Sequence, residues 1–448
     1  MRTYARSQSI LERNRHAIPG GLSSLNRLTE PAITFVRGEG AHLWDADGNE
    51  YIDYHGAFAP QFLGYGHPRV VEAVKRALDE GLDLFGSGAS EQEGRLAELM
   101  REHLGWADSA AFFNSGSEAT AQAIRLARAA TGRDHIIVMQ GGYNGWHNDV
   151  ACNLMTPLET LGPRVCPGEY PFLPISAGIP QAHRALIHPV NFNDIRSVRW
   201  VCERYPVAAL ITEPILQNVG LIHPQPGYLE ALRSLSRELG FLLIFDEIKT
   251  GFRHGLGGYA GLSGVQPDLA VYGKAIASGY PLAAIAGRAE HMDLFAHRDP
   301  SKRVLLAGTY NAHPVPVAAA IATIEALAEG GGDVYRGVER LGARMEAGLR
   351  ERLSGLGRPV TVVRQGSAFV AYFMDHAPRD WHDLAEHHDF TLDNELRRRL
   401  LEKGVYFFPL AVKQCSLSTA HGEAEVDSTL EAVEAVVEEL LRAPGGVS

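Results

Sequence analysis

Two short apolar segments lead into side chains that could carry out acid–base or nucleophilic chemistry. Phe241–Phe245 is followed at once by Asp246 and Glu247, and Leu269–Val271 comes shortly before Lys274. Such apolar runs are typical of strands buried on both faces of a parallel sheet. Because chemistry in open α/β sheets gathers beyond the carboxyl ends of the strands, we expect an acid and an amine at one sheet edge. A solvated loop lysine is the alternative, but the residues that flank Lys274 are small and apolar, and a desolvated lysine can act as a nucleophile.

A second candidate site lies where an apolar strand leads into a helix. Asn114–Ala119 follows Ala110–Phe113 and opens a helix-forming segment that stops at Gly132. Backbone amides at a helix N-terminus, together with the hydroxyls of Ser115 and Ser117, make a suitable cradle for a phosphate. An ordinary serine cap is the more common explanation for such a segment taken alone. The glycine spacings of dinucleotide-binding and Walker motifs are absent, so a nucleotide is not favoured.

Two further residues follow predicted strands at the same edge. Tyr143 comes after Gly141 and Gly142, where an aromatic ring could cover a flat ligand, although a turn residue is the commoner role. Glu213 ends another apolar run; like Asp246 it could cap a helix, bind a metal or pair with a cationic nitrogen, and the absence of metal-ligand spacing nearby disfavours the metal. A phosphate anchor, an aromatic cover, an acid for a ring nitrogen and an amine for a carbonyl together predict pyridoxal 5'-phosphate.

Composition and charge disfavour several other functions. The formal net charge of −11 argues against a nucleic-acid partner, which usually requires a basic surface. No apolar run reaches the roughly 18 residues of a membrane helix, and residues 1–6 lack the apolar core of a signal peptide. The four cysteines form neither a CxxC pair nor a metal-ligand spacing, which predicts reduced thiols in a cytoplasmic protein: Cys152, Cys166, Cys202 and Cys415.

The order of the predicted elements indicates an α/β chain with more than one domain. Residues 1–67 combine a polar arm with a small antiparallel ribbon, and residues 68–329 alternate strands and helices. This alternation predicts a mainly parallel sheet with helices on both faces. Residues 330–448 are predicted to form a smaller α+β domain. The segment 150–190, rich in proline and glycine, interrupts the alternation and is expected to be a lid or binding loop.

The motifs resemble those of a known family. The chain is similar to the class III, fold-type I pyridoxal-phosphate aminotransferases and, within them, to the glutamate-1-semialdehyde aminomutase group. The likeness runs from Pro19–Gly21 to Ser418–His421, and its most specific parts are Asn114–Ala119, Phe245–Arg253, Gly273-Lys274 and Gly308-Thr309. It implies a large domain with a mainly parallel seven-stranded sheet sandwiched by helices, and a small α+β domain formed by the N-terminal arm and the C-terminal part.

The resemblance also implies roles for individual residues. Lys274 would form the internal aldimine with the cofactor and later move the substrate proton, and Asp246 would pair with the pyridinium nitrogen. The implied homodimer would bring Thr309 to the neighbouring subunit's cofactor. The cofactor contacts implied in this way are Ser115, Gly116, Ser117, Tyr143, Glu213, Asn218, Asp246, Ile248, Lys274 and Thr309.

Departures from the family pattern concern the substrate. Lys413 stands where the aminomutase has a glutamate, and Asn144 stands where the family has a histidine. Arg27, with Ser24 before it, matches the position where the aminomutase arm holds a substrate carboxylate, although a solvated arm residue is the alternative. Arginine suits this task because its fork can donate two parallel hydrogen bonds to a carboxylate. Phe58 is expected to line the same pocket.

The predicted function is therefore a ping-pong transamination between a carboxylate-bearing amino donor and a keto or aldehyde acceptor, through pyridoxamine 5'-phosphate. The substrate is expected among β- or ω-amino acids or specialised metabolites, with neither nucleic acid nor membrane as a partner. The alternatives are glutamate-1-semialdehyde 2,1-aminomutase, an epimerase on the same cofactor, and a catalytically silent protein that retains the fold. The last is disfavoured by the presence of both Lys274 and Asp246.

Overall fold

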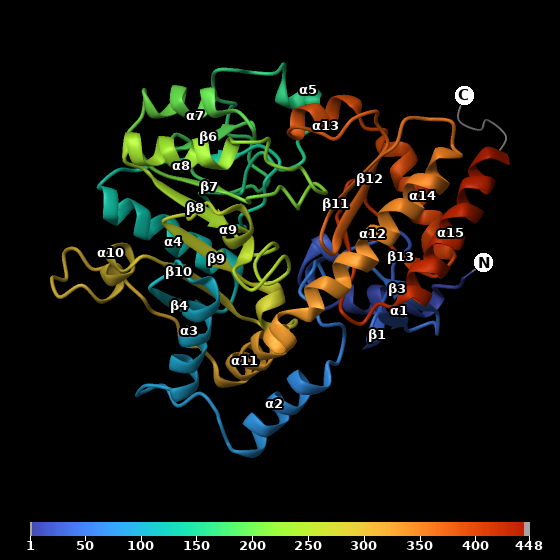
Figure 1. The fold of residues 1–448 in the computed structure, drawn as a ribbon, viewed down its shortest axis with the longest axis horizontal. Helices are drawn as coiled ribbons and strands as arrows, with labels where there is room; N and C mark the ends of the chain where they lie inside the picture. Colours follow the sequence, from blue (N-terminus) through green and yellow to red (C-terminus); the bar gives the residue numbers. More distant parts are fainter. Residues whose placement is uncertain (1, 443–448) are drawn as a thin grey trace. The chain divides into compact units, whose positions relative to one another are not determined.

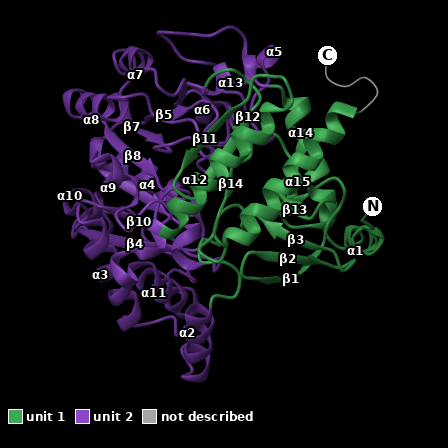
Figure 2. Cartoon of the chain, turned by 45° about the vertical axis from the view of Figure 1, so that its right-hand side comes forward, with its two compact units in different colours: residues 1–67, 337–376, 389–448 green, residues 68–336, 377–388 purple. Residues whose placement is uncertain are grey.

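The computed structural model describes residues 2–442, and its ribbon is drawn in Figure 1. The chain forms two compact units, and each unit is built from segments that are separate in the sequence (Figure 2). Unit 1 comprises residues 1–67, 337–376 and 389–448, and unit 2 comprises residues 68–336 and 377–388. The short segment 377–388 thus leaves the C-terminal part of the chain and packs as part of unit 2.

Unit 2 is built around a seven-stranded sheet with the strand order β4-β10-β9-β8-β7-β5-β6. Strand β10 runs antiparallel to β4 and β9, and the remaining neighbouring pairs are parallel. This arrangement confirms the predicted α/β fold with a mainly parallel sheet. The strands are β4 (Ser109–Phe113), β5 (His135–Met139), β6 (Ile187–Val190), β7 (Val207–Thr212), β8 (Leu242–Asp246), β9 (Leu269–Tyr272) and β10 (Ala283–Gly287).

The central strands are apolar and buried along their whole length, as the continuous hydrophobic runs indicate. Strand β6 is the exception to prediction from the sequence, because it contains Pro189 and ends the proline-rich segment 150–190. Proline cannot donate to the hydrogen-bond ladder and is therefore confined to edge strands. Strand β6 lies at the edge of the sheet, where this loss is tolerated.

Helix α4 packs on the sheet beside the expected cofactor site. It contacts β4 and strands β7 to β10, and its buried face carries fully buried small residues such as Ala119, Ala123 and Ala127, which permit a close approach. The helix ends where the sequence predicts, at Gly132 in a left-handed C-cap. The helices of unit 2 are α2 (Pro68–Asp79), α3 (Glu91–Leu104), α4 (Gly116–Thr131), α5 (Leu158–Leu161), α6 (Gln181–Arg184), α7 (Ile195–Cys202), α8 (Tyr228–Leu239), α9 (Gly258–Ser263), α10 (Ala289–Met292), α11 (Pro314–Ala328) and α13 (Trp381–His387).

Unit 1 combines two small sheets with helices. One sheet has the order β1-β2-β3-β13 and the other the order β11-β12-β14. Strand β13 from the C-terminal part pairs in parallel with β3, so that Val405 lies opposite Ile52. The elements are α1 (Ala5–Arg15), β1 (Phe35–Glu39), β2 (His42–Asp45), β3 (Glu50–Asp53), α12 (Asp333–Ser354), β11 (Thr361–Gln365), β12 (Ala368–Tyr372), α14 (Phe390–Glu402), β13 (Val405–Tyr406), β14 (Cys415–Ser416) and α15 (Glu423–Arg442).

A large apolar core lies within unit 1. Its fully buried members include Met345 on α12, Leu400 on α14 and Val433 on α15, which pack together with Phe369 and Phe407. Among the described residues, no helix combines the length and the apolar character that crossing a membrane requires.

Candidate active site

Asp246 is the last residue of β8 and lies at the carboxyl edge of the sheet, paired in register with Val271 of β9. Its side chain is buried, with the residue only 2 % exposed. Asn144 Nδ2 donates to Asp246 Oδ2 at 2.8 Å, and the backbone N–H of Ile248 donates to Oδ1 at 3.0 Å. Burial raises the pKa of Asp246, and these two donors act in the opposite direction. A buried carboxylate of this kind is stabilised further when a cationic group binds beside it.

Lys274 follows β9 by two positions and has a strained backbone, with a φ of 50°. Left-handed conformations are costly for residues other than glycine and gather at functional sites. Burial lowers the pKa of Lys274, the carboxylates of Asp246 and Glu213 oppose this shift, and Arg253 adds to it. A lysine with a lowered pKa spends more time as the neutral amine, which is the form that attacks a carbonyl.

The N-terminus of α4 has the properties of a phosphate site. Ser115 caps the helix: its Oγ accepts from the N–H of Glu118 at 3.3 Å, while the Glu118 carboxylate accepts from the Ser115 N–H. The first amides of a helix have no partner within it, so those of Gly116 and Ser117 are available to an anion. Ser117 Oγ accepts from the N–H of Trp146 at 3.2 Å. Both serine hydroxyls therefore keep their hydrogens for donation to a phosphate.

Gly116 and Gly273 make room for Ile248 between the phosphate site and the lysine. A Cβ on Gly116 would lie 2.5 Å from Ile248 Cδ1, and a Cβ on Gly273 would lie 3.4 Å from Ile248 Cγ2. Real Cβ atoms do not approach as closely as 2.5 Å, so a larger residue at position 116 would force the end of the Ile248 side chain to move. Ile248, which the resemblance predicts as a cofactor contact, thus lies against Gly116 at the start of α4 and against Gly273, the residue before Lys274.

Glu213 anchors the turn that carries Tyr143. The N–H of Tyr143 donates to Glu213 Oε1 at 3.1 Å, and the N–H of Gln217 donates to Oε2 at 2.9 Å. Burial raises the pKa of Glu213 to about 7, while the Lys249 ammonium opposes this rise. Burial also raises the pKa of the Tyr143 phenol. Asn218, next to Gln217, is partly buried.

The two adjacent carboxylates at the end of β8, Asp246 on the strand and Glu247 directly after it, have different partners. Glu247 accepts hydrogen bonds from the N–H groups of Tyr259 and Ala260, both at 2.8 Å, and from the Thr250 hydroxyl at 2.5 Å. It therefore stabilises the N-terminus of α9. Glu247 thus binds residues of its own fold, whereas Asp246 accepts from the side chain of Asn144 on the turn after β5.

Asn144 is a site residue that the sequence identifies only as a departure from the family pattern. Its side chain is almost completely buried and holds Asp246 through the hydrogen bond described above. Neither periodicity nor spacing predicts this contact, because Asn144 lies on the turn after β5 and Asp246 lies at the end of β8. Its position directly after Tyr143 is the one signal that could have identified it.

These residues fit pyridoxal 5'-phosphate. The helix N-terminus with its uncommitted amides and hydroxyls suits a phosphate, the buried Asp246 suits a cationic ring nitrogen, and Lys274 with its lowered pKa suits the aldehyde. Thr309 is exposed on the loop before α11. In that loop Asn311 Oδ1 accepts from Asn114 Nδ2 at 3.2 Å, beside the phosphate site of the same chain.

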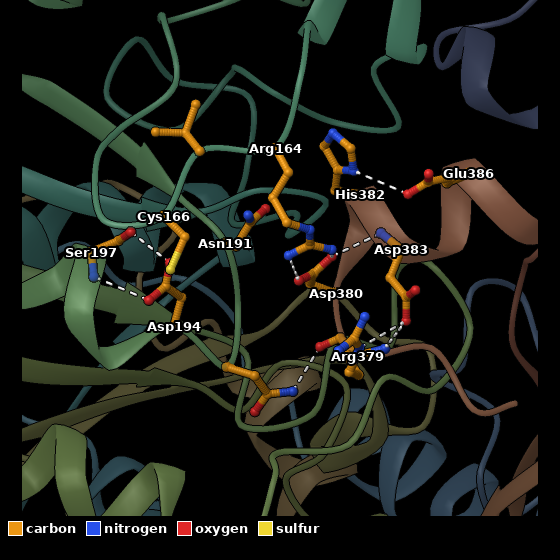
Figure 3. Close-up of polar contacts among 12 residues, drawn as sticks. Arg164, Cys166, Asn191, Asp194, Ser197, Arg379, Asp380, His382, Asp383 and Glu386 are labelled. Atoms are coloured by element: carbon orange, nitrogen blue, oxygen red, sulfur yellow. Dashed lines mark hydrogen bonds and ion pairs between the residues drawn. The ribbon is translucent and has the colours of Figure 1, made fainter.

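Part of the segment 150–190 is hydrogen-bonded to the N-terminal end of α13 (Figure 3). Arg164 makes two parallel hydrogen bonds to the buried Asp380, at 2.6 and 2.8 Å. The Trp381 indole N–H donates to the carbonyl of Thr156 at 2.9 Å. Asp380 also caps α13 by accepting from the N–H of Asp383 at 2.8 Å. This part of the predicted lid is thus held by specific polar contacts within unit 2.

The residues predicted for the substrate belong to unit 1. Arg27 and Phe58 line the same cavity, whereas Ser24 and Lys413 are not among its lining residues. The backbone around Lys413 is held by α14, since the buried Arg397 donates to the carbonyl of Lys413 at 2.9 Å. Lys413 itself is partly buried.

Comparison with known proteins gives one consistent family. The model of the family described as Aminotransferase class-III matches residues 25–437. Glutamate-1-semialdehyde 2,1-aminomutase from Thermus thermophilus is 39% identical over 435 residues, which cover 95% of this chain and 98% of that protein. The structure of an omega-transaminase from Sphaerobacter thermophilus superposes with a TM-score of 0.86 at 30% sequence identity, and the match covers 96% of this chain and 97% of the transaminase chain. A beta-phenylalanine aminotransferase from Variovorax paradoxus has a TM-score of 0.82 at 30% identity, covering 97% and 94%. The chain therefore belongs to the class III aminotransferases, enzymes that depend on pyridoxal 5'-phosphate.

Proposed function

We propose that the enzyme transfers an amino group from a carboxylate-bearing donor to a keto or aldehyde acceptor, in two half-reactions. The observation that carries this proposal is the pair at the sheet edge. Asp246 is buried and held by two N–H donors, and Lys274, two residues past the end of the neighbouring strand β9, has a pKa lowered by burial. When bound, pyridoxal 5'-phosphate supplies an electron sink for the negative charge that forms at the substrate Cα.

The residues of this chain have separate tasks in that reaction. The ionised Asp246 keeps a proton on the cofactor's ring nitrogen. Lys274 would hold the cofactor at its aldehyde carbon and, as the nearest base, would remove and return the proton at the substrate Cα. Proton transfer by a positioned group of this kind is worth about 10²–10⁴-fold in rate. The α4 terminus with Ser115 and Ser117 fixes the phosphate, while Tyr143, Ile248 and Asn218 orient the ring, with Glu213 holding the Tyr143 turn.

A donor half-reaction without acceptor tests this proposal. The purified holoenzyme is mixed with single amino donors, and the visible absorbance of the cofactor is followed together with the release of keto product. Stoichiometric conversion by at least one donor, lost in Lys274→Ala, is expected. If no donor in a panel of β- and ω-amino acids changes the cofactor spectrum, the proposal of a two-substrate transamination is wrong.

The second candidate is glutamate-1-semialdehyde 2,1-aminomutase activity. It is favoured by the 39% identity with the Thermus thermophilus protein of that name over almost the whole chain. Against it stands Lys413, which places a cation where the resemblance expects a glutamate. Incubation with glutamate 1-semialdehyde separates the two candidates, because the aminomutase yields 5-aminolevulinate without any added acceptor. Lys413→Glu should raise this yield if the charge at position 413 decides the outcome.

A homodimer in which Thr309 completes the partner's phosphate site also belongs to the proposal. The loop that carries Thr309 exposes Leu305, Leu306 and Tyr310, with exposed fractions of 67%, 43% and 62%. Large apolar side chains grouped on a surface favour an interface. Mixing Lys274→Ala subunits with Thr309→Ala subunits tests the arrangement. A contact across the dimer restores one complete site in each mixed dimer, whereas a contact within one chain restores none.

A further inference from the structure

The turn 143–149, which follows β5, lies along one side of helix α4. Gly145 approaches the helix so closely that a Cβ there would lie 2.9 Å from Ser117 Oγ and 3.1 Å from Ser117 Cα. At the other end of the turn, Asp149 accepts hydrogen bonds from both terminal nitrogens of Arg128, at 3.0 and 3.1 Å. Ser117, Thr120 and Arg128 follow one another on α4 at intervals that place them on the same side of the helix. The turn is thus held against α4 along its length.

Thr120 connects α4 to the buried acid of the candidate site. It is fully buried, and its hydroxyl donates to the backbone carbonyl of Asn144 at 2.6 Å. The Asn144 side chain in turn donates to Asp246 Oδ2 at 2.8 Å. The helix whose N-terminus suits a phosphate therefore also holds the residue that binds Asp246. One rigid element would in this way set the distance between the phosphate and the ring nitrogen of the cofactor.

The contacts of the Thr120 hydroxyl determine which nitrogen of His147 carries a hydrogen. Thr120 Oγ1 lies 2.6 Å from the carbonyl oxygen of Asn144 and 3.2 Å from that of Ser117. A hydroxyl has a single hydrogen and a carbonyl oxygen can only accept, so the hydrogen of Thr120 points to a carbonyl. His147 Nε2, at 3.1 Å from the same hydroxyl oxygen, must then be the donor. Donation by His147 thus turns the Thr120 hydroxyl toward Asn144.

The surroundings of His147 keep its ring neutral. Burial lowers the pKa of His147 to about 4, the carboxylate of Asp149 opposes this shift, and Arg128 supports it. Asp149 Oδ2 lies 4.0 Å from His147 Nδ1, and the same carboxylate lies 3.5 Å from His183 Nδ1. Near pH 7 the His147 ring therefore has one hydrogen, on Nε2. The orientation of the Thr120 hydroxyl is accordingly constant around neutral pH.

We propose that Thr120 and His147 are positioning residues for the transamination: they hold the Asn144 amide against Asp246 at a fixed distance from the phosphate site on α4. Both side chains act through Asn144 and not on the reacting atoms. The proposal rests on the role given to Asp246 beside the ring nitrogen of the cofactor, and it is independent of which amino donor the enzyme uses.

Thr120→Val tests the proposal, because it removes the hydroxyl and keeps the shape of the side chain. We expect kcat/KM near neutral pH to fall about 2- to 13-fold, which is equivalent to the loss of one neutral hydrogen bond of about 0.5–1.5 kcal/mol. A weaker contact with Asn144 raises the pKa of Asp246, so the acidic limb of kcat/KM should move to higher pH by up to about one pH unit. The absorbance of the bound cofactor, titrated without any donor, should move with it. Thr120→Ser, which retains the hydroxyl, should behave as the wild type does.

Variants of His147 give a second, independent measurement. His147→Leu removes the donor to Thr120 and should move the limb and the cofactor titration in the same direction, whereas His147→Gln, whose amide can donate in place of Nε2, should recover most of the change. The other titratable groups that act on Asp246 are the same in all of these variants, so that the movement reports the Asn144 contact: Lys274, Lys249, Glu213, Glu247 and Tyr143.

A double-mutant cycle shows whether Thr120 acts through Asn144. In the Asn144→Ala background, Thr120→Val should leave the limb and the cofactor titration where Asn144→Ala alone puts them. Thr131→Val is the matched control on α4, because the Thr131 hydroxyl donates within the helix, to the carbonyl of Ala127 at 2.8 Å. This control should leave both measurements unchanged.

Two results would overturn the proposal. One is an unchanged limb and an unchanged cofactor titration in Thr120→Val, and the other is full additivity of Thr120→Val with Asn144→Ala. A melting curve identifies a variant that has lost its fold, in which case the His147 pair decides. Absence of any donor turnover would contradict the proposed function alone, since the cofactor titration requires no donor.

Discussion

Asn144 offers the sharpest test of how the site controls its buried acid. In Asn144→Ala, Asp246 loses the donor at Oδ2 and keeps only the Ile248 N–H at Oδ1. A hydrogen bond to a charged group is worth about 1.5–3 kcal/mol, and Asp246 is too deeply buried for water to replace it freely. The loss of this hydrogen bond destabilises the ionised form of Asp246 by about 1.5–3 kcal/mol. The ion pair of Asp246 with a protonated ring nitrogen is weakened by the same free energy. We expect kcat/KM near neutral pH to fall about 10- to 150-fold.

The pH profile of the same variant distinguishes this effect from a general disturbance. Burial already raises the pKa of Asp246, and removal of a donor to the charged form raises it further. The acidic limb of kcat/KM should therefore move to higher pH. The bound cofactor's absorbance, titrated over the same range, should move with it. Asn144→His, which retains a ring N–H donor, should recover most of the loss. If Asn144→Ala binds the cofactor normally and shows an unchanged limb and rate, the assigned role of the hydrogen bond is wrong.

Three other predictions test the cofactor site and the lid. Burial raises the pKa of Glu213 from 4.5 to about 7. The neutral carboxyl therefore contributes to the stability of the folded state below pH 4.5, and this contribution is lost as the pH rises from 4.5 through 7. Relative to wild type, the free energy of unfolding of Glu213→Gln apo-protein, measured with denaturant, should rise by on the order of 3 kcal/mol between pH 5 and pH 8. Gly116→Ala places a Cβ 2.5 Å from Ile248 Cδ1 and should weaken cofactor affinity at least tenfold in a titration, with partial recovery when Ile248→Val removes that atom. Arg164→Ala leaves Asp380 buried without its cation, so limited proteolysis should cut the segment 150–190 several-fold faster, and an unchanged cleavage rate would refute the fastening of the lid.

Local patterns predict the sheet of unit 2 because its central strands are continuous apolar runs. The end of β8 is found in this way, and with it Asp246. Strand β6 escapes prediction, since Pro189 is a poor strand residue everywhere except at an edge, and the edge position is a property of the assembled sheet. The packing of α13 with unit 2 is likewise a tertiary property, which depends on partners such as Arg164 and Thr156 far away in the sequence.

The sequence predicts those residues of the candidate site whose type alone indicates their chemistry. Lys274 and the serines of the α4 terminus are recognisable in combination, because an amine for a carbonyl and a helix N-terminus for a phosphate are predicted at the same sheet edge. The different tasks of Asp246 and Glu247 cannot be distinguished by composition, because both are carboxylates and only their hydrogen-bond partners differ. The same holds for Asn144, whose role depends on a contact between two separate strand ends.

The pairing of β13 with β3 has a consequence for how the polypeptide acquires its structure during synthesis. Ile52 leaves the ribosome long before its strand partner Val405 does. The apolar side chains of the N-terminal ribbon therefore remain without their C-terminal partners while residues 68–336, the larger part of unit 2, can already fold. Pairings between such distant residues are slow and leave unpaired edges exposed to aggregation. A chain truncated before residue 405 should accordingly fail to form unit 1, and a nascent chain should depend on chaperones until β13 has been made.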